Sequence, residues 1–154
     1  MKYTNLGQTD IRISRITHGC MELGGGKWFT ASREHNMALL KSAFDRGITT
    51  FDTAEGYGAG NSEEIVGEAL SPVRDKCVIC TKVLKEHLHA ADVRTATENS
   101  LRRLRTDYID LLYVHWPNPD IPLEETLGEM DKLRSEGKIR AIGVSNFDVP
   151  LLEQ

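Results

Sequence analysis

The chain has 154 residues and a formal net charge of −4; 40% of its residues are hydrophobic and 27% are charged. This balance is typical of a globular domain and excludes an extended disordered chain. Lysine and arginine are scattered, and no apolar run reaches the roughly 18 to 20 residues of a transmembrane helix, so we expect neither a nucleic-acid surface nor a membrane partner. The first residues lack the apolar stretch of a secretory signal, which favours a cytoplasmic location.

A β-hairpin is predicted at the start of the chain, within residues 1–14. Its strands are expected at 2–6 and 11–13, joined by the turn-forming segment 7–10. Five short runs rich in β-formers follow, at residues 13–19, 49–53, 77–83, 108–115 and 139–145. Most of these runs are continuous rather than alternating, which is the pattern of parallel strands covered on both faces.

Four helices are expected between these strands, because apolar residues recur there every three or four positions. Their expected boundary residues are Gly47 after the first helix, Asn61 and Glu64 as a capping pair of the second, Asp92 ahead of the third, and Pro122 and Gly137 at the two ends of the fourth. Residues 147–154 are expected to begin a fifth helix. Repetition of strand and helix indicates an α/β fold with a parallel sheet and right-handed crossovers.

The three cysteines, Cys20, Cys77 and Cys80, predict no disulfide framework, because their number is odd and the chain has no export signal. Cys77 and Cys80 have the spacing of a C-x-x-C motif, but residues three apart on a strand point to opposite faces. No second Cys or His pair supplies further zinc ligands. We therefore interpret them as structural thiols and predict no metal site.

The last residues of the five expected strands recur at a steady interval. They are Cys20, Asp52, Lys82, His115 and Ser145, in steps of 32, 30, 33 and 30 residues. Such a period is the length of one βα unit, so these residues occupy equivalent strand ends. In a closed barrel those ends converge on the face that carries the active site, whereas in an open doubly wound sheet they spread along an edge.

Asp52, Tyr57, Lys82 and His115 form a chemically coherent set. A tyrosine hydroxyl, with an ordinary pKa of about 10, is a poor acid near neutrality unless a neighbouring ammonium favours its phenolate. Lys82 would supply that charge, Asp52 would hold the lysine, and His115 would hydrogen-bond the reacting oxygen. This set suits protonation of an oxygen that gains charge as a carbonyl accepts hydride, which requires a nicotinamide or flavin cofactor.

Each of these residues also has an ordinary structural interpretation. Asp52 and Tyr57 fit a turn, Lys82 fits a surface lysine whose stem packs on apolar groups, and His115 fits a packed histidine. The shared register of three strand ends favours the chemical interpretation over three independent structural roles.

Four ordered motifs resemble those of the aldo-keto reductase family. They are FDTAEGYG at 51–58, TK at 81–82, YVHWP at 113–117 and GVSNF at 143–147. The resemblance implies a TIM-barrel-type parallel (β/α)8 fold with a hairpin across its bottom. It also implies reduction of small aldehydes and ketones with NADPH, less often with NADH.

The resemblance also implies roles for single residues. Asp52, Tyr57, Lys82 and His115 match the catalytic tetrad, with Tyr57 as general acid and base. Ser145 and Asn146 match the pair that binds the nicotinamide carboxamide. The remaining matches are Cys20, Met21 and Asp52 as neighbours of the cofactor, and Trp28 and Trp116 as candidates to line the substrate pocket, for which plain packing is an equal alternative.

The length predicts only part of such a barrel. A (β/α)8 domain takes about 250 residues, whereas residues 1–154 account for a hairpin (1–14) and βα units (15–154) that stop after the fifth strand. We expect one incomplete barrel domain, whose open sheet edges favour self-association or pairing with a missing half. No glycine-rich G-x-G-x-x-G loop is present, so we expect this chain alone to bind NADPH weakly and to be inactive.

Two alternatives remain open. One is a non-catalytic nucleotide-binding or regulatory subunit on the same barrel, as in family members that act as auxiliary subunits of cation channels. The other is an open-sheet nucleotide-binding domain, which the missing phosphate-binding loop disfavours.

Overall fold

The computed structural model describes residues 1–26 and 29–153. Its first element is an antiparallel hairpin of β1 (Tyr3–Asn5) and β2 (Arg12–Ser14). A parallel sheet follows, with the order β3-β4-β5-β6-β7. Its strands are β3 (Thr17–Gly19), β4 (Thr50–Asp52), β5 (Val78–Val83), β6 (Ile109–Val114) and β7 (Ile139–Val144).

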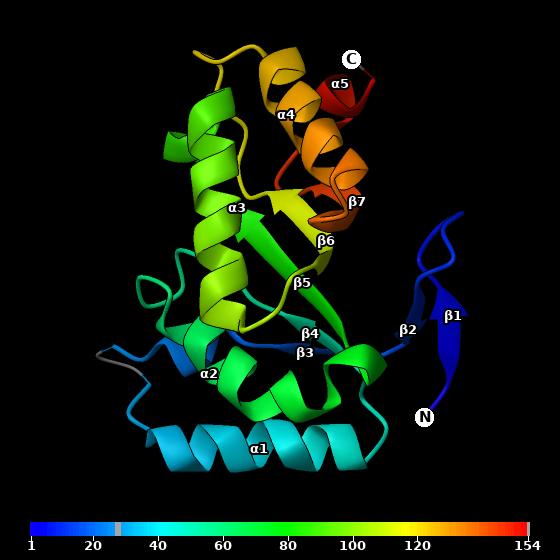
Figure 1. The fold of residues 1–154 in the computed structure, drawn as a ribbon, viewed down its shortest axis with the longest axis vertical. Coiled ribbons are helices and arrows are strands. Elements are labelled where there is room, and N and C mark those ends of the chain that lie inside the picture. The colour runs from blue at the N-terminus through cyan, green and yellow to red at the C-terminus, as the bar shows by residue number, and fades with distance from the viewer. Residues whose placement is uncertain (27–28, 154) are drawn as a thin grey trace.

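The first four α-helices lie between strands of the parallel sheet in sequence and along one side of that sheet in space, and α5 follows the last strand (Figure 1). They are α1 (Arg33–Asp45), α2 (Asn61–Leu70), α3 (Ala90–Leu104), α4 (Leu123–Ser135) and the short α5 (Val149–Leu152). Three 3₁₀ turns complete the connections: η1 (Met21–Gly24), η2 (Ser71–Lys76) and η3 (Lys85–His87).

The strand order confirms the predicted repeat and separates the two parallel architectures. Each new strand joins the same growing edge of the sheet, so spatial order and chain order agree throughout the described residues. A doubly wound sheet reverses direction at a switch point, with helices on both faces. The described sheet has no reversal, which is the strand order of a barrel.

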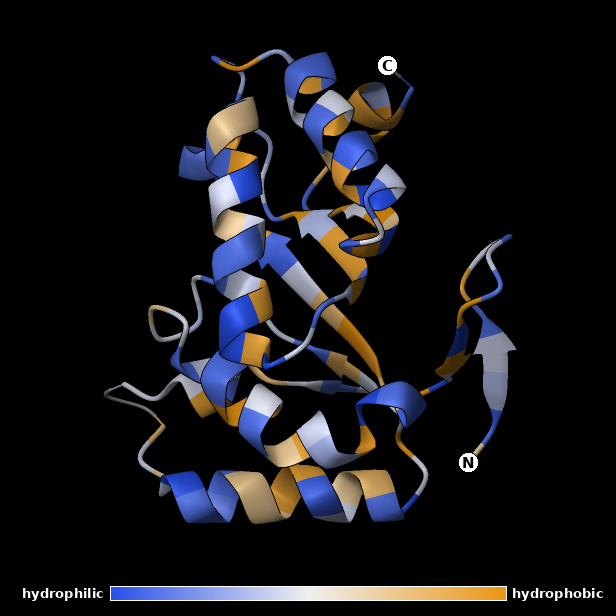
Figure 2. Ribbon diagram, viewed as in Figure 1, coloured by the Kyte–Doolittle hydropathy of each residue, from blue (hydrophilic) through white to orange (hydrophobic). Residues whose placement is uncertain are grey.

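Two apolar layers lie on opposite faces of the sheet. The larger packs the helices onto the strands and includes Phe51 and Leu112, which are fully buried. The smaller lies on the inner face and joins Ile11 of the hairpin to Val78 and Leu111 of the strands. The hairpin therefore covers the starts of the strands. Figure 2 shows β5 as apolar at its start and more hydrophilic toward its end; Thr81 and Lys82 come just before its last residue, Val83.

Cys77 and Cys80 lie on opposite faces of the sheet, as the sequence predicts. All three are buried and unpaired, and Cys77 packs in the outer layer whereas Cys80 packs in the inner one. Burial raises the pKa of the Cys77 thiol to about 11 and that of Cys80 to about 12. Both thiols are therefore protonated and unreactive near neutral pH. No group of three metal-ligating side chains within residues 1–26 and 29–153 could hold a metal ion.

The predicted start of the second helix is wrong in one respect. Asn61 is the first residue of α2 rather than its cap, and the cap is Gly60, at φ 94°. The Asn61 amide instead donates to the carbonyl oxygens of Leu23 and Gly24, at 3.4 and 3.3 Å. A contact with another βα unit has displaced the local capping interaction.

Other boundaries differ by a few residues. The first parallel strand covers only residues 17–19 of the predicted 13–19, because Ser14 ends the hairpin and its hydroxyl donates to the Ile16 carbonyl. Helix α3 begins at residue 90, ahead of the expected start near Asp92, and Pro122 is the cap of α4 rather than its first residue. Gly47 and Gly137 have positive φ after α1 and α4, as predicted.

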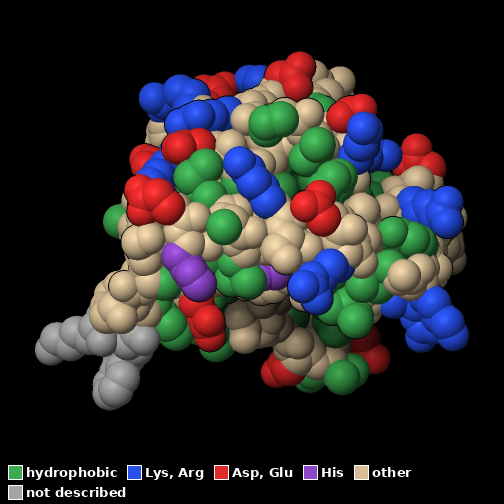
Figure 3. All heavy atoms as spheres, turned by 90° about the horizontal axis from the view of Figure 1, so that it is seen from below, with side chains coloured by type: hydrophobic (Ala, Val, Ile, Leu, Met, Phe, Trp, Pro, Cys, Tyr) green, Lys and Arg blue, Asp and Glu red, His purple; other side chains and the backbone are tan. Residues whose placement is uncertain are grey.

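The surface mixes both signs of charge. On the face drawn in Figure 3, acidic and basic side chains are interspersed. None of the helices in the described ranges has the length and hydropathy needed to cross a membrane.

Candidate active site

Strand register brings Asp52, Lys82 and His115 to one face of the sheet. Asp52 pairs with Cys80, so Lys82 lies two residues further along its strand. Lys82 in turn pairs with Tyr113, so His115 lies two residues further again. Because side chains alternate along a strand, an even offset keeps all three on the same face. That face is the inner one, at the carboxyl ends of the strands.

The Lys82 ammonium is the centre of the site. Its Nζ donates to Asp52 Oδ1 at 2.5 Å, to the Thr53 carbonyl at 2.7 Å and to the Tyr57 hydroxyl at 3.3 Å. The side chain is only 8% exposed. An ammonium has three hydrogens, and each has an acceptor here. The Asp52 carboxylate compensates the buried positive charge, which would be costly if unpaired.

Tyr57 lies in the loop between β4 and α2 and faces both Lys82 and His115. The lysine Nζ is 4.9 Å from the centre of the tyrosine ring. The His115 ring meets the tyrosine ring edge-on, with centroids 5.7 Å apart and planes at 80°. The predicted set of four residues is thus assembled within one contact network.

Sequence reasoning missed two glycines that support the Tyr57 loop. Gly58 has φ 62°, and a Cβ on it would lie 2.0 Å from the Gly24 carbonyl oxygen. A Cβ on Gly24 would lie 2.7 Å from the Gly58 nitrogen. The backbones of η1 and the Tyr57 loop therefore touch directly, which only glycine allows at both positions. The glycines were visible in the sequence, but their contact joins two different βα units.

Ser62 also connects the start of η1 to the start of the Tyr57 loop. It is fully buried; its hydroxyl donates to the Cys20 carbonyl at 2.6 Å and shares a 2.9 Å hydrogen bond with the Thr53 hydroxyl. The Cys20 N–H is also engaged, by the Asp52 carbonyl at 2.8 Å. The N–H and the carbonyl group of Cys20 are thus both hydrogen-bonded within the protein. Met21, in contrast, is 54% exposed beside the site.

His115 is half-buried and lies at the end of β6. Burial lowers the pKa of His115, and the Lys82 charge lowers it further. This histidine is therefore neutral at neutral pH and has one N–H to donate. Its Nδ1 is the one buried side-chain polar atom without a hydrogen-bond partner among the described residues. A buried nitrogen without a partner is better tolerated as a lone pair than as an N–H group. We therefore assign the ring hydrogen of His115 to Nε2.

Ser145 and Asn146 follow β7 at the same edge. Asn146 has φ 62°, and its Nδ2 donates to the His115 carbonyl at 2.8 Å and to Ser145 Oγ at 3.0 Å. These bonds leave the Asn146 Oδ1 as an acceptor and the Ser145 hydroxyl hydrogen as a donor. A primary carboxamide offers the matching donor and acceptor. The donor set therefore fits the carboxamide of a nicotinamide.

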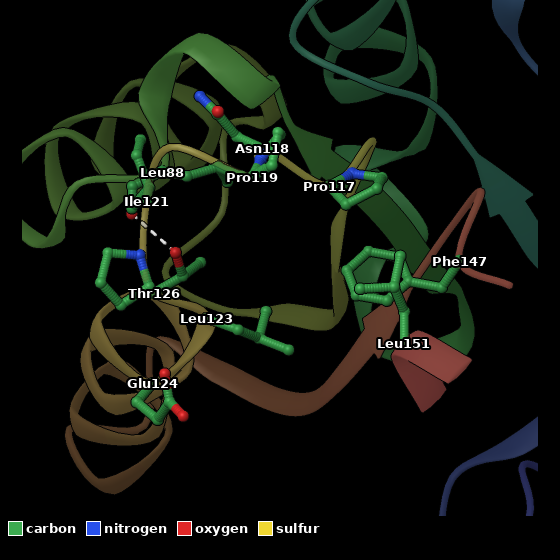
Figure 4. Close-up of a pocket in the computed structure, with 11 residues that line it drawn as sticks. Leu88, Pro117, Asn118, Pro119, Ile121, Leu123, Glu124, Thr126, Phe147 and Leu151 are labelled. Atoms are coloured by element: carbon green, nitrogen blue, oxygen red, sulfur yellow. Dashed lines mark hydrogen bonds between the residues drawn. The ribbon is translucent and has the colours of Figure 1, made fainter. Parts of the chain in front are cut away.

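The described part of the chain does not show either tryptophan as a member of this network. Trp116, directly after His115, is 51% exposed; Trp28 lies outside the described residues. A groove of about 540 Å³ begins nearby, between the β6–α4 loop and α5, with Pro117 and Phe147 on its wall (Figure 4). None of the four tetrad residues lines it.

Comparison with known proteins identifies the family. The family model "Aldo/keto reductase family" matches residues 15–154. The chain belongs to the aldo-keto reductase family. It is 44% identical to aldo-keto reductase YhdN of Bacillus subtilis over 99% of this chain and 49% of that protein. It is 37% identical to an NADH-specific methylglyoxal reductase of Escherichia coli, over 96% of this chain and 53% of that protein. The chain spans about half the length of these relatives.

Solved aldo-keto reductases share this fold. The thermostable aldo-keto reductase Tm1743, in complex with the inhibitor epalrestat, matches with a TM-score of 0.92 and 46% identity over 99% of this chain and 57% of that chain. An aldo-keto reductase of Klebsiella pneumoniae in complex with NADPH matches with a TM-score of 0.86 and 42% identity, over 92% and 49%. The predicted family and TIM-barrel-type architecture are confirmed.

Proposed function

We propose that this aldo-keto reductase chain carries the proton-transfer half of an NAD(P)H-dependent carbonyl reductase, with Tyr57 as general acid and base. The observation that supports it most is the Lys82 ammonium, held by Asp52 and Thr53 and donating to the Tyr57 hydroxyl. A small aldehyde or ketone is the substrate class that this arrangement serves.

The direction of the Lys82 hydrogen bond explains how Tyr57 acts. Because the ammonium donates to the phenol oxygen, the phenol hydrogen points elsewhere and is free to bond a substrate oxygen. When that proton moves to the substrate, the oxygen left on Tyr57 carries a negative charge at 3.3 Å from Lys82 Nζ. At that distance in a partly buried site, the ammonium stabilises the phenolate.

His115 supplies a second contact to the same substrate oxygen. Its ring lies edge-on to Tyr57, and in its neutral form the Nε2–H is a donor. This positions the carbonyl oxygen between two donors without adding a competing acid.

The nicotinamide end of the cofactor would bind at Ser145 and Asn146, with Met21 and Asp52 as further neighbours. A reduced nicotinamide supplies the hydride that these side chains lack the chemistry to provide. The relatives include an NADPH complex and an NADH-specific enzyme, so both cofactors are candidates. The exposed Trp116, and Trp28 on sequence grounds, are proposed to shape the substrate entrance.

We also propose that residues 1–154 form one incomplete barrel domain that is inactive alone. Its cofactor contacts lie at the nicotinamide end, and the sequence has no glycine-rich loop for the pyrophosphate. Within the described sheet β7 pairs only with β6, so its other edge is open to a further strand from a second copy or a completing half.

The test is Tyr57→Phe in this chain continued by the second half of YhdN, which supplies the rest of a barrel. Phenylalanine keeps the ring beside His115 and removes only the acid. We expect kcat to fall by about 10² to 10⁴-fold and the NADPH dissociation constant to stay unchanged. The control is Tyr108→Phe, at the other end of the strands, over Arg74. Unchanged turnover in Tyr57→Phe contradicts the role proposed for Tyr57, whereas a parent protein that binds NADPH without turnover favours a regulatory, nucleotide-binding subunit on the same scaffold.

A further inference from the structure

Glu55 is a buried carboxylate beside the tetrad with no role in the chemistry proposed above. Its side chain is 8% exposed. Its Oε1 accepts the backbone N–H of Leu84 at 2.7 Å and lies 3.0 Å from His87 Nδ1. Because a carboxylate only accepts, the histidine Nδ1 is the donor in this pair. Both partners belong to the loop that follows β5.

These contacts join the loop that carries Tyr57 to the loop that follows Lys82 and β5. Glu55 lies two residues before Tyr57, and Leu84 lies two residues after Lys82. The Glu55 N–H donates to the Lys82 carbonyl at 3.3 Å. The Leu84 side chain also covers Gly56, where an added Cβ would lie 2.9 Å from Leu84 Cδ2. The two segments are thus connected by three kinds of contact, each within two residues of Tyr57 on one side and of Lys82 on the other.

We propose that Glu55 is a positioning residue, whose carboxylate holds the Tyr57 loop against the end of β5 and so sets the distance between Lys82 Nζ and the Tyr57 hydroxyl. The inference rests on the proposed role of Tyr57. That distance is 3.3 Å, already slightly longer than the usual 2.7–3.2 Å for a nitrogen donor and an oxygen acceptor. A small retreat of the loop would therefore break the bond.

A second buried glutamate provides a contrast. Glu63 is fully buried and binds the Thr81 hydroxyl at 2.5 Å and Arg103 Nε at 2.6 Å. It lies on α2, on the helix side of the sheet, and contacts none of the tetrad. Of these two glutamates, only Glu55 belongs to the Tyr57 loop and bonds the loop that follows β5.

The chain contains a matched control. The Glu125 carboxylate accepts the Ala90 N–H at 2.9 Å and lies 3.2 Å from His89 Nδ1. It thus makes the same pair of contacts as Glu55, at the far end of the loop between β5 and α3 and away from Tyr57. Glu125→Leu removes equivalent hydrogen bonds without touching the tetrad loops.

The experiment compares Glu55→Gln, Glu55→Leu and Glu125→Leu. Tyrosine labelled with ¹³C at Cζ gives signals from four tyrosines, and Tyr57→Phe assigns the one of interest. In the 154-residue chain at neutral pH we expect Glu55→Leu to move the Tyr57 ¹³Cζ resonance away from its position in the parent chain, because the phenol oxygen loses the Lys82 contact. Glu55→Gln retains an acceptor for Leu84, so it and Glu125→Leu should leave that resonance in place.

Turnover is measured in the chain continued by the second half of YhdN. We expect Glu55→Leu to lower kcat at least about tenfold with the KM for NADPH nearly unchanged, because the effect is on the acid and not on cofactor binding. Glu55→Gln should restore most of kcat. If the parent protein shows no turnover, the proposed function fails, while the Tyr57 resonance still tests the positioning role.

Three results overturn the inference. An unchanged Tyr57 resonance and wild-type kcat in Glu55→Leu would show that the carboxylate does not position Tyr57. Equal loss in Glu55→Gln and Glu55→Leu would mean that charge, not the acceptor, matters. Equal loss in Glu125→Leu would mean a general effect on the fold. If Glu55→Leu does not fold, Glu55→Asp, which withdraws the acceptor by one CH₂, is expected to show the same displaced resonance and answers the same question.

Discussion

The contact between Gly58 and Gly24 makes Gly58→Ala a sharp probe of how the Tyr57 loop is held. The substitution adds one Cβ at a residue with φ 62°, and that atom would lie 2.0 Å from the Gly24 carbonyl oxygen and 2.6 Å from the carbonyl carbon. Both neighbours are backbone atoms, so no side-chain rotation relieves the clash. One loop has to move away from the other.

Two separate costs set the magnitude. A left-handed conformation costs a non-glycine residue roughly 1–2 kcal/mol, and forcing an extra carbon into a packed site costs typically 1–3 kcal/mol. We therefore expect Gly58→Ala to lower the free energy of unfolding by about 2–5 kcal/mol. Gly7→Ala is the matched control, because Gly7 has φ 54° and nothing within 4 Å of an added Cβ. It should pay only the conformational cost.

Urea unfolding of both variants of the 154-residue chain, with equal m-values as a check, gives the difference directly. Gly58→Ala should be less stable than Gly7→Ala by about 1–3 kcal/mol, the cost of the steric clash alone. If the two variants lose the same stability, the contact between η1 and the Tyr57 loop does not constrain the chain, and the argument for that contact is refuted.

Two further predictions concern His115 and the cofactor. Because the pKa of His115 is lowered in the folded state, by burial and then by Lys82, the unfolded chain binds this proton at higher pH than the native one. The contribution of neutral His115 to stability is therefore present above about pH 6.5 and is lost as the pH falls below that value. Between about pH 8 and pH 5, urea unfolding should show a smaller decline in the free energy of unfolding for His115→Asn than for the parent. Parallel declines in the two proteins would contradict this. NADPH titrated into the 154-residue chain as a monomer should show weak or no binding by fluorescence, whereas tight one-to-one binding would refute the proposal that further segments are required.

The sequence predicted the strands and the tetrad because both rest on patterns that are local or periodic. Continuous apolar runs mark buried strands, and one βα unit per thirty residues or so places Asp52, Lys82 and His115 at successive strand ends. Helix ends marked by Gly47 and Gly137 were also predictable, because the positive φ after a helix is a local requirement.

The errors and omissions lie where two βα units meet. Asn61 has the right residue type for a cap, yet it bonds the carbonyls of η1, which begins some forty residues earlier in the chain. Likewise, Glu55 reads as one more charged loop residue until its carboxylate is seen to accept the Leu84 N–H. No local pattern reports such partners, because they are set by how adjacent units pack.

The period along the chain does not by itself bring the candidate catalytic residues together; the pairing register does. A spacing near thirty residues places a residue at each strand end, but a one-residue slip between strands would turn its side chain to the opposite face. Asp52, Lys82 and His115 share the inner face because each lies two residues beyond the last in register. Tyr57 has no place in this register, because it lies in the loop after β4 and meets Lys82 near the end of β5. The register positions only the residues at the strand ends. The rest of the site, including Tyr57, therefore depends on contacts between loops, such as those of Glu55 and Gly24.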